Sequence, residues 1–145
     1  MFDDICSVIS KGEQLTLSEI FSDTRKVEIL YARQLIAYFS REMKIGSLSF
    51  IGKKVGKDHA TVVHAIKSIN NYIDTDKTKR GQIEKYRERI EHIRMLHIKK
   101  EEMEMLITPL KNEISGLESK LINIQIMSKN IIDSINDLYR EKENI

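Results

Sequence analysis

The second half of the sequence repeats apolar residues at alternating spacings of three and four, and this repeat is compatible with little other than long helix. The repeat extends over residues 83–138, with Lys100 and Ser128 as its polar members. Such spacing places every member on one stripe of a helix, and a stripe sustained over several heptads is typical of a coiled coil. Two successive spacings of three within residues 90–96 form a local stammer. The apolar members are Ile83, Tyr86, Ile90, Ile93, Leu96, Met103, Ile107, Leu110, Ile114, Leu117, Leu121, Ile124, Ile131, Ile135 and Leu138.

The dipeptide Thr108-Pro109 complicates a single rod. Proline inside a helix costs about 3 kcal/mol, whereas proline in the first helical position after a threonine cap is favourable. We therefore predict two helices, Lys79–Ile107 and Pro109–Glu143, that meet at a bend or fold back as a hairpin. Because the apolar spacing continues across the proline, a kinked single helix is the alternative. Residues 82–145 are assigned to a coiled coil or helical hairpin with a break near Pro109.

Residues 1–75 have shorter apolar patterns that indicate several helices around one core. One of these helices is apolar on more than one side and is therefore expected to be buried. Thr16 and Glu19 have the spacing of a capping box. The first predicted helices are Asp3–Lys11, Thr16–Phe21 and Lys26–Met43, the last being the buried one.

A charged segment, Asp74–Gly81, separates the two halves. Charge and glycine interrupt the apolar pattern there, so we predict a linker at residues 76–81. With one proline, six glycines and 41% hydrophobic residues, the composition favours helices with few turns. The predicted fold class is all-α, with a small helical bundle followed by long helices.

The segment Ser47–Ile73 contains the signals of two helices joined by a tight turn. Ser47 is placed to cap the first helix, Gly56 can adopt the left-handed conformation that ends it, and Asp58 is placed to cap the second. The second helix has an apolar stripe made of Val62, Ile66, Ile69 and Ile73. The first turn of this helix is therefore expected to face outward. The same turn faces outward in a helix-turn-helix that reads the major groove of DNA.

Three motifs in residues 32–69 resemble the C-terminal DNA-binding domain of the bacterial chromosomal replication initiator DnaA. They are Ala32-Arg33-Gln34, then Ser47-Leu48-Ser49-Phe50-Ile51-Gly52, then Gly56-Lys57-Asp58-His59-Ala60-Thr61-Val62-Val63-His64-Ala65. Weaker similarity extends upstream, through Leu17–Phe21 and the pair Arg25 and Lys26. The resemblance implies a helix-turn-helix bundle of Trp repressor-like type and binding to double-stranded DNA.

The resemblance also implies which residues meet DNA. The second helix of the motif would offer Asp58, His59 and Ala60 to base edges. The upstream loop that carries Arg25 and Lys26 would place these two residues in the minor groove. Exposed amides and cationic or hydroxyl side chains suit phosphate oxygens. The residues assigned to phosphates are Lys53, Lys54, Lys57, Thr61 and His64.

Three departures from the family pattern concern the same residues. Ala60 stands where the family has a threonine, and Lys57 stands where it has an arginine, which keeps the charge but loses bidentate geometry. Asp23 and Glu28 flank the loop pair, which makes this loop less basic than in the family. The preferred DNA sequence is therefore expected to differ from a standard initiator site.

The distribution of charge supports a nucleic-acid partner. Residues 25–67 contain nine Lys and Arg against three acidic residues, an excess of six, whereas the whole chain has a net charge of +2. Concentrated positive charge of this kind releases counterions when it meets phosphates. The nine include Arg33, Arg41 and Lys44, any of which can also be an ordinary surface charge.

The sequence favours a binding protein over an enzyme. It has no G-x-x-x-x-G-K-[ST] phosphate loop, so we expect no nucleotide and no ATPase module, and its histidine pairs lack the i, i+4 spacing of a metal-binding helix. No cofactor is expected. The lone Cys6 cannot form an internal disulfide, and no apolar run is long enough for a membrane span, so a cytoplasmic protein is predicted. No aromatic platform for RNA is visible.

The long repeat predicts a protein partner. Burying an apolar stripe requires a second strand, and a homodimer that presents two DNA-reading helices is the expectation. An intramolecular hairpin or a different protein partner remains the alternative. The sequence thus favours DNA binding that regulates replication initiation or transcription. The alternative function is a structural or protein-interaction role carried by the coiled coil, with a vestigial DNA-binding fold.

Overall fold

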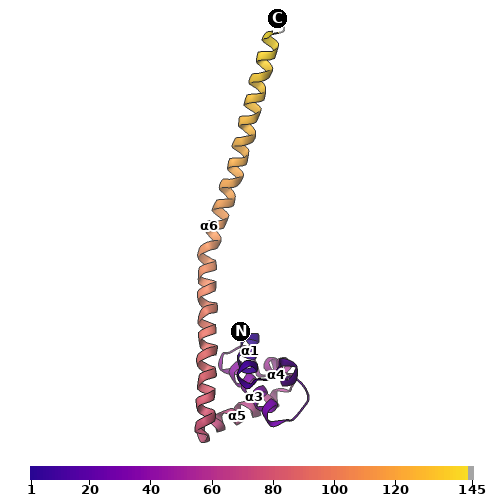
Figure 1. Ribbon diagram of the computed structural model, residues 1–145, viewed down its shortest axis with the longest axis vertical. Coiled ribbons are helices and arrows are strands. Elements are labelled where there is room, and N and C mark those ends of the chain that lie inside the picture. The colour runs from indigo at the N-terminus through magenta and orange to yellow at the C-terminus, as the bar shows by residue number, and fades with distance from the viewer. Residues whose placement is uncertain (144–145) are drawn as a thin grey trace. The chain divides into compact units, whose positions relative to one another are not determined.

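The computed structural model describes residues 1–143, which form six α-helices and no strand (Figure 1). The all-α prediction is confirmed. The chain divides into two compact units, Met1–His97 and the residues from Ile98 onward. The helices are α1 (Phe2–Glu13), α2 (Leu17–Ile20), α3 (Val27–Glu42), α4 (Leu48–Val55), α5 (His59–Thr75) and α6 (Lys77–Glu143).

Helix α3 is the centre of the first unit. It packs against α1, α2, α4 and α5, and it is buried on more than one side, as its composition predicted. Leu35, Ile36 and Phe39 are fully buried. Around them lie apolar residues of the other helices, which include Ile5, Ile9, Ile20, Ile51, Val55, Val62 and Ile69. This single core fixes the positions of α4 and α5 relative to the loop before α3.

The start of α6 belongs to the first unit, which differs from the predicted domain boundary at residue 75. Ile83, Tyr86 and Ile90 are buried in the same core as α3. The phenol of Tyr86 donates a hydrogen bond to the Glu13 carboxylate at 2.6 Å. Further along, the Arg87 guanidinium donates to the Glu42 carboxylate of α3 at 2.6 Å. These residues continue the heptad spacing but face a globular core.

The linker predicted at residues 76–81 is replaced by a tight junction between α5 and α6. Asp76 ends α5, and its carboxylate accepts hydrogen bonds from the backbone N–H groups of Thr78 and Lys79 at 2.9 and 3.0 Å. The ammonium of Lys79 lies 3.5 Å from the centre of the Tyr72 ring. The guanidinium of Arg80 donates to the carbonyl oxygens of Ile73 and Asp74. The charges that suggested a flexible segment therefore cap two helix ends.

The break predicted at Pro109 is also not found, because α6 continues through it. Proline removes its own N–H donor and so leaves the carbonyl oxygen four residues earlier, that of Met105, without its helical partner. Met105 is exposed, so water can satisfy this oxygen. The Thr108 hydroxyl donates to the Glu104 carbonyl at 2.7 Å instead of capping a new helix. The kinked single helix is the alternative that this geometry favours.

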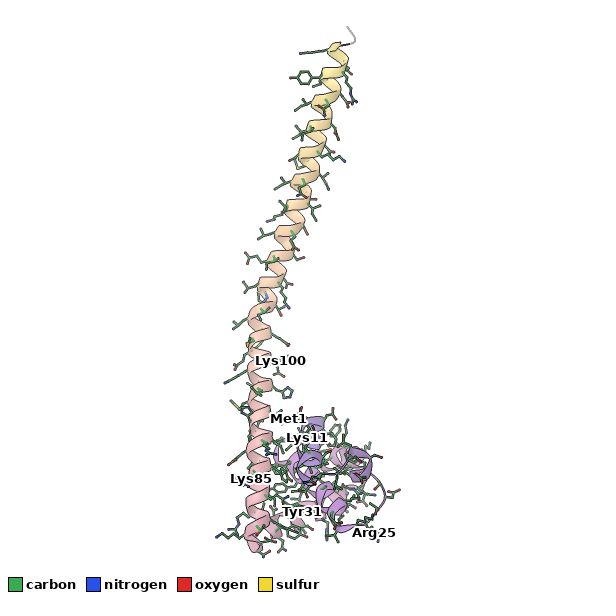
Figure 2. All side chains as sticks on the ribbon, in the orientation of Figure 1. Met1, Lys11, Arg25, Tyr31, Lys85 and Lys100 are labelled. Carbon is green, nitrogen blue, oxygen red and sulfur yellow. The ribbon has the colours of Figure 1, made fainter. Side chains whose placement is uncertain are left out.

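The second unit, taken by itself, is a helix with an uncovered apolar row. Figure 2 shows side chains projecting around this helix beyond Lys100. The heptad members from Met103 to Leu138 are 39–62% exposed, apart from the polar Ser128. Within residues 1–143, no helix is long and apolar enough to cross a membrane.

Candidate nucleic-acid interface

Helices α4 and α5 are joined by a tight turn. The three signals predicted for the ends of these helices are confirmed. The Ser47 hydroxyl accepts from the backbone N–H of Phe50 at 3.2 Å, which caps α4. Gly56 ends α4 with a φ of 67°, in the left-handed region that favours glycine. The Asp58 carboxylate accepts from the backbone N–H of Thr61 at 2.7 Å, which caps α5. The capping box predicted at the start of α2 is confirmed too.

Gly52 explains why α4 lies so close to the turn. A Cβ atom at this position would lie 2.6 Å from the backbone oxygen of Lys57, a distance that real side chains do not tolerate. The absence of a side chain lets the Lys57 N–H donate to the Gly52 carbonyl at 2.8 Å. Gly52 therefore sets the separation of the two helices, a role that its position in the S-L-x-x-I-G motif did not reveal.

The first turn of α5 is presented outward. Asp58, His59, Ala60 and Thr61 are all exposed, whereas the stripe that begins at Val62 is turned into the core. Hydrogen bonds from the Thr61 side chain and N–H hold the pKa of the Asp58 carboxyl below its usual value. The cap is therefore a carboxylate at neutral pH, and it is available as a hydrogen-bond acceptor.

A hollow of about 760 Å³ lies between this turn and the loop before α3. Arg25 lines it from the loop, and Asp58, Ala60, Thr61 and His64 line it from α5. The remaining lining residues are Asp23, Leu30, Arg33, Gln34, Ala37, Val55, Lys57, Val62 and Ala65. Two segments more than thirty residues apart in the sequence thus line one concave surface.

An ion pair joins two residues that line this hollow. The Lys57 ammonium lies 3.2 Å from the Asp23 carboxylate, and the Asp23 side chain is fully exposed. Sequence reasoning identified Asp23 only as a charge that makes the loop less basic. The pairing joins residues 34 positions apart, so no local signal could have found it.

Arg33 is not part of the positive surface, although it was counted there with the other basic residues. Its side chain is buried, with 7% exposure. The guanidinium donates to the carbonyl oxygen of Ile20, the last residue of α2, at 2.9 Å, and to that of Ser22, in the loop that follows, at 2.5 Å. The signal that could have revealed this role was its place in the helix predicted to be buried on more than one side.

The other predicted residues are distributed around the hollow. Lys53 and Lys54 are exposed in the last turn of α4, and Lys54 lies 5.6 Å from the Phe2 ring. Lys26 is exposed at the start of α3. Along α5, the His64 imidazole lies 3.4 Å from the Ser68 hydroxyl. Lys53, Lys54, Lys26 and His59 do not line the hollow. No group of three His, Cys, Asp or Glu side chains suited to a metal occurs in the described part of the chain.

Two helices joined by this short turn, with the second one presenting its N-terminal turn, define a helix-turn-helix protein. The comparison with protein families narrows this class. Residues 2–69 match the family model described as the bacterial dnaA protein helix-turn-helix. The first part of the chain is therefore a helix-turn-helix domain of the bacterial DnaA type, as its motifs suggested.

Curated relatives are similar to part of the chain. The chain is 43% identical over 76 residues to the chromosomal replication initiator protein DnaA of Flavobacterium psychrophilum, covering 52% of the chain and 16% of the relative. It is 39% identical over 83 residues to the protein of that name from Bacteroides thetaiotaomicron, covering 57% and 18%. For the Streptococcus thermophilus protein of that name, the identity is 38% over 89 residues, covering 61% and 20%. The chain thus spans about a fifth or less of these relatives.

Proposed function

We propose that this protein binds double-stranded DNA in a sequence-specific manner through the hollow between the loop and α5. The observation that carries the proposal is that Arg25 and the first turn of α5 line one concave surface. The match of residues 2–69 to a DnaA helix-turn-helix supports it. In a helix-turn-helix, the second helix enters the major groove with its N-terminal residues against base edges.

The exposed turn gives each proposed base contact a chemistry. The Asp58 carboxylate can accept from a cytosine amine while it also caps α5, and His59 can donate to or accept from a base edge. The Ala60 methyl group can pack against the methyl group of thymine. Together these three residues would read the major groove.

The proposed phosphate contacts surround this turn. Lys57, Thr61 and His64 lie on the hollow, and the exposed Lys53 and Lys54 extend the positive surface along α4. From the loop, Arg25, which lines the hollow, and its neighbour Lys26 would enter the minor groove beside the major groove that α5 occupies. Contacts to phosphates position the protein, and contacts to bases specify the sequence.

The first test is selection from a randomised duplex library by the full-length protein at near-physiological salt, followed by sequencing of the bound pool. The expected result is one enriched motif, related to initiator sites but altered at the positions that Lys57 and Ala60 face. A pool that stays random after several rounds would refute sequence-specific binding.

Single substitutions separate base readers from phosphate contacts. His59→Ala is expected to lose the preference for the selected site over random DNA, whereas Lys54→Ala weakens both duplexes about equally and reduces the salt slope by about one. Lys11→Ala is the matched control, because Lys11 is an exposed lysine on another side of the bundle from Arg25 (Figure 2). Equal effects of His59→Ala on both duplexes would refute its assignment.

The process that such binding regulates is proposed to be replication initiation or transcription, through sites of initiator type. Footprinting on a replication origin and on promoters that contain the selected motif distinguishes the two. Protection of the origin supports the first process, and protection of promoters alone supports the second.

A second function is favoured by the uncovered apolar row on the second unit. We propose that a second copy of the chain covers this row, so that each assembly contains two DNA-binding units. Sedimentation equilibrium of the wild-type chain is expected to give the mass of a dimer. A monomer mass at all concentrations would refute self-association. A dimer without salt-sensitive DNA binding would instead indicate a purely protein-interaction role.

A further inference from the structure

Residues 100–142 of α6 follow an uninterrupted heptad pattern beyond the stammer. With heptad positions labelled a to g, the a positions are Lys100, Ile107, Ile114, Leu121, Ser128, Ile135 and Lys142. The d positions are Met103, Leu110, Leu117, Ile124, Ile131 and Leu138. Ten of these side chains are apolar, and all ten are exposed in the single chain.

The width of this row suits one further helix. Charged residues occupy most e and g positions in the first part of the segment: Glu104, Lys111, Glu113, Glu118 and Lys120. In this part of the segment they restrict the apolar stripe to the a and d positions, which is the narrow seam of a two-stranded coiled coil. A row from Met103 to Leu138 is about 54 Å long at 1.5 Å per residue. Apolar rows of this extent are rare on monomers and mark an interface.

A parallel arrangement of two copies places like charges together. In a parallel dimer, a g residue faces the e residue five positions later on the other copy. Glu113 would then face Glu118 of the second copy, twice in each dimer. At the a positions, Lys100 would also face Lys100 of the second copy, and Lys142 would face Lys142 of the second copy. The only opposite-charge pair is Lys99 with Glu104, and it offsets the glutamate pair.

An antiparallel arrangement removes every like-charge pair. In the register that sets Leu121 opposite Ile124 of the second copy, each a residue faces a d residue. Ile107 then faces Leu138, and Ile114 faces Ile131. This register continues without a gap along the whole row.

In the same register, the e and g positions that flank the seam bring no two charges of the same sign together. Charged residues of the first part face neutral residues of the second part: Glu104 with Tyr139, Lys111 with Ile132, Glu118 with Gln125, and Lys120 with Met127. The methylene stems of the two lysines can cover the apolar side chains while their ammonium groups remain in water.

The polar core position is also accommodated. Ser128 would face Leu117, and its hydroxyl can donate to the carbonyl four residues earlier. Two other serines of this helix do so in the structure: Ser119 donates to Ser115 at 3.0 Å, and Ser134 donates to Asn130 at 2.9 Å. In the dimer, the buried Ser128 hydroxyl would therefore find a partner within its own helix.

We propose that residues 100–142 pair with a second copy of this chain as an antiparallel two-stranded coiled coil, with Leu121 opposite Ile124. This inference rests on the proposed self-association and adds its direction and register.

Disulfide trapping tests the register. One chain carries Leu117→Cys and a mass tag, and the other carries Ser128→Cys; the two are mixed, allowed to exchange subunits and oxidised mildly. The mixture is expected to form the mixed disulfide at least tenfold faster than either variant alone forms its homodimer. The wild-type chain gives the background, because Cys6 is buried and burial raises the pKa of its thiol to about 11.

A mixture of Leu117→Cys with Leu110→Cys is the mismatched control and should stay at background, because in this register neither residue lies near the other or near its own copy. Circular dichroism of each variant verifies that the helix is retained, and an Ile114→Cys and Ile131→Cys mixture repeats the test at a second layer. Rapid homotypic crosslinking of Ser128→Cys would overturn the antiparallel direction while leaving self-association intact. A wild-type chain that sediments only as a monomer would overturn both proposals.

Discussion

Replacing Arg33 with methionine tests whether this arginine supports the fold or meets DNA. The guanidinium is 7% exposed and donates to the carbonyl oxygens of Ile20 and Ser22. Each hydrogen bond from a charged group contributes about 1.5–3 kcal/mol net of desolvation, so losing both bonds is expected to cost about 3–6 kcal/mol of unfolding free energy.

The assay is urea unfolding of Arg33→Met followed by circular dichroism, with Arg41→Met as the control. Arg41 is an exposed arginine of the same helix. Its substitution is expected to change the free energy of unfolding by less than about 0.5 kcal/mol. Because the loop that carries Arg25 loses its anchor, Arg33→Met should also weaken specific DNA binding without changing the number of phosphates contacted.

The salt dependence of DNA binding provides the refutation. If Arg33 contacted a phosphate, its removal would reduce the slope of log K against log salt by about 0.9. An unchanged free energy of unfolding together with that reduced slope would refute the positioning role argued from the buried hydrogen bonds.

Three other predictions concern the core, the hollow and the pH dependence of stability. Ile83→Ala should cost about 2–5 kcal/mol of unfolding free energy, because Ile83 is fully buried, whereas Ile114→Ala should leave thermal unfolding of the first unit unchanged; equal effects would contradict the assignment of early α6 to the core. Asp23→Asn should raise DNA affinity about twofold in titrations at low salt, because it frees Lys57 for a phosphate, and a lowered affinity would show that Asp23 assists binding. Burial raises the pKa of Tyr86 to about 12, so the stability it contributes is complete below about pH 10 and is lost as the pH rises toward 12. Denaturant unfolding at increasing pH measures this loss, and Tyr86→Phe should reduce its steepness; an unchanged steepness would contradict the prediction.

The features that could be predicted from the sequence depend on residues only a few positions apart. The caps at Ser47 and Asp58, the left-handed Gly56 and the capping box of Thr16 were all read from such local patterns and confirmed. Each is a hydrogen bond or backbone conformation that one turn of chain determines. The resemblance to the DnaA domain added the expectation that these helices form a helix-turn-helix bundle.

The features that could not be predicted depend on distant residues. The heptad spacing of Ile83 and Tyr86 was consistent with a coiled coil, and only the folded core shows which surface covers them. The charges of Asp76 and Arg80 resembled a solvated linker because their partners are helix ends rather than opposite charges. The proposed DNA-contacting residues were predicted from family resemblance rather than from local patterns.

The burial of Ile83, Tyr86 and Ile90 in the first core has a consequence for how such a protein can evolve. A recombination event at Asp76 would exchange the tail but would also remove three side chains from the core of the recipient. A breakpoint after His97 would keep the first unit whole and change only the second. The point at which the two parts can be inherited separately therefore lies inside a continuous helix, about twenty residues beyond the turn that separates α5 from α6.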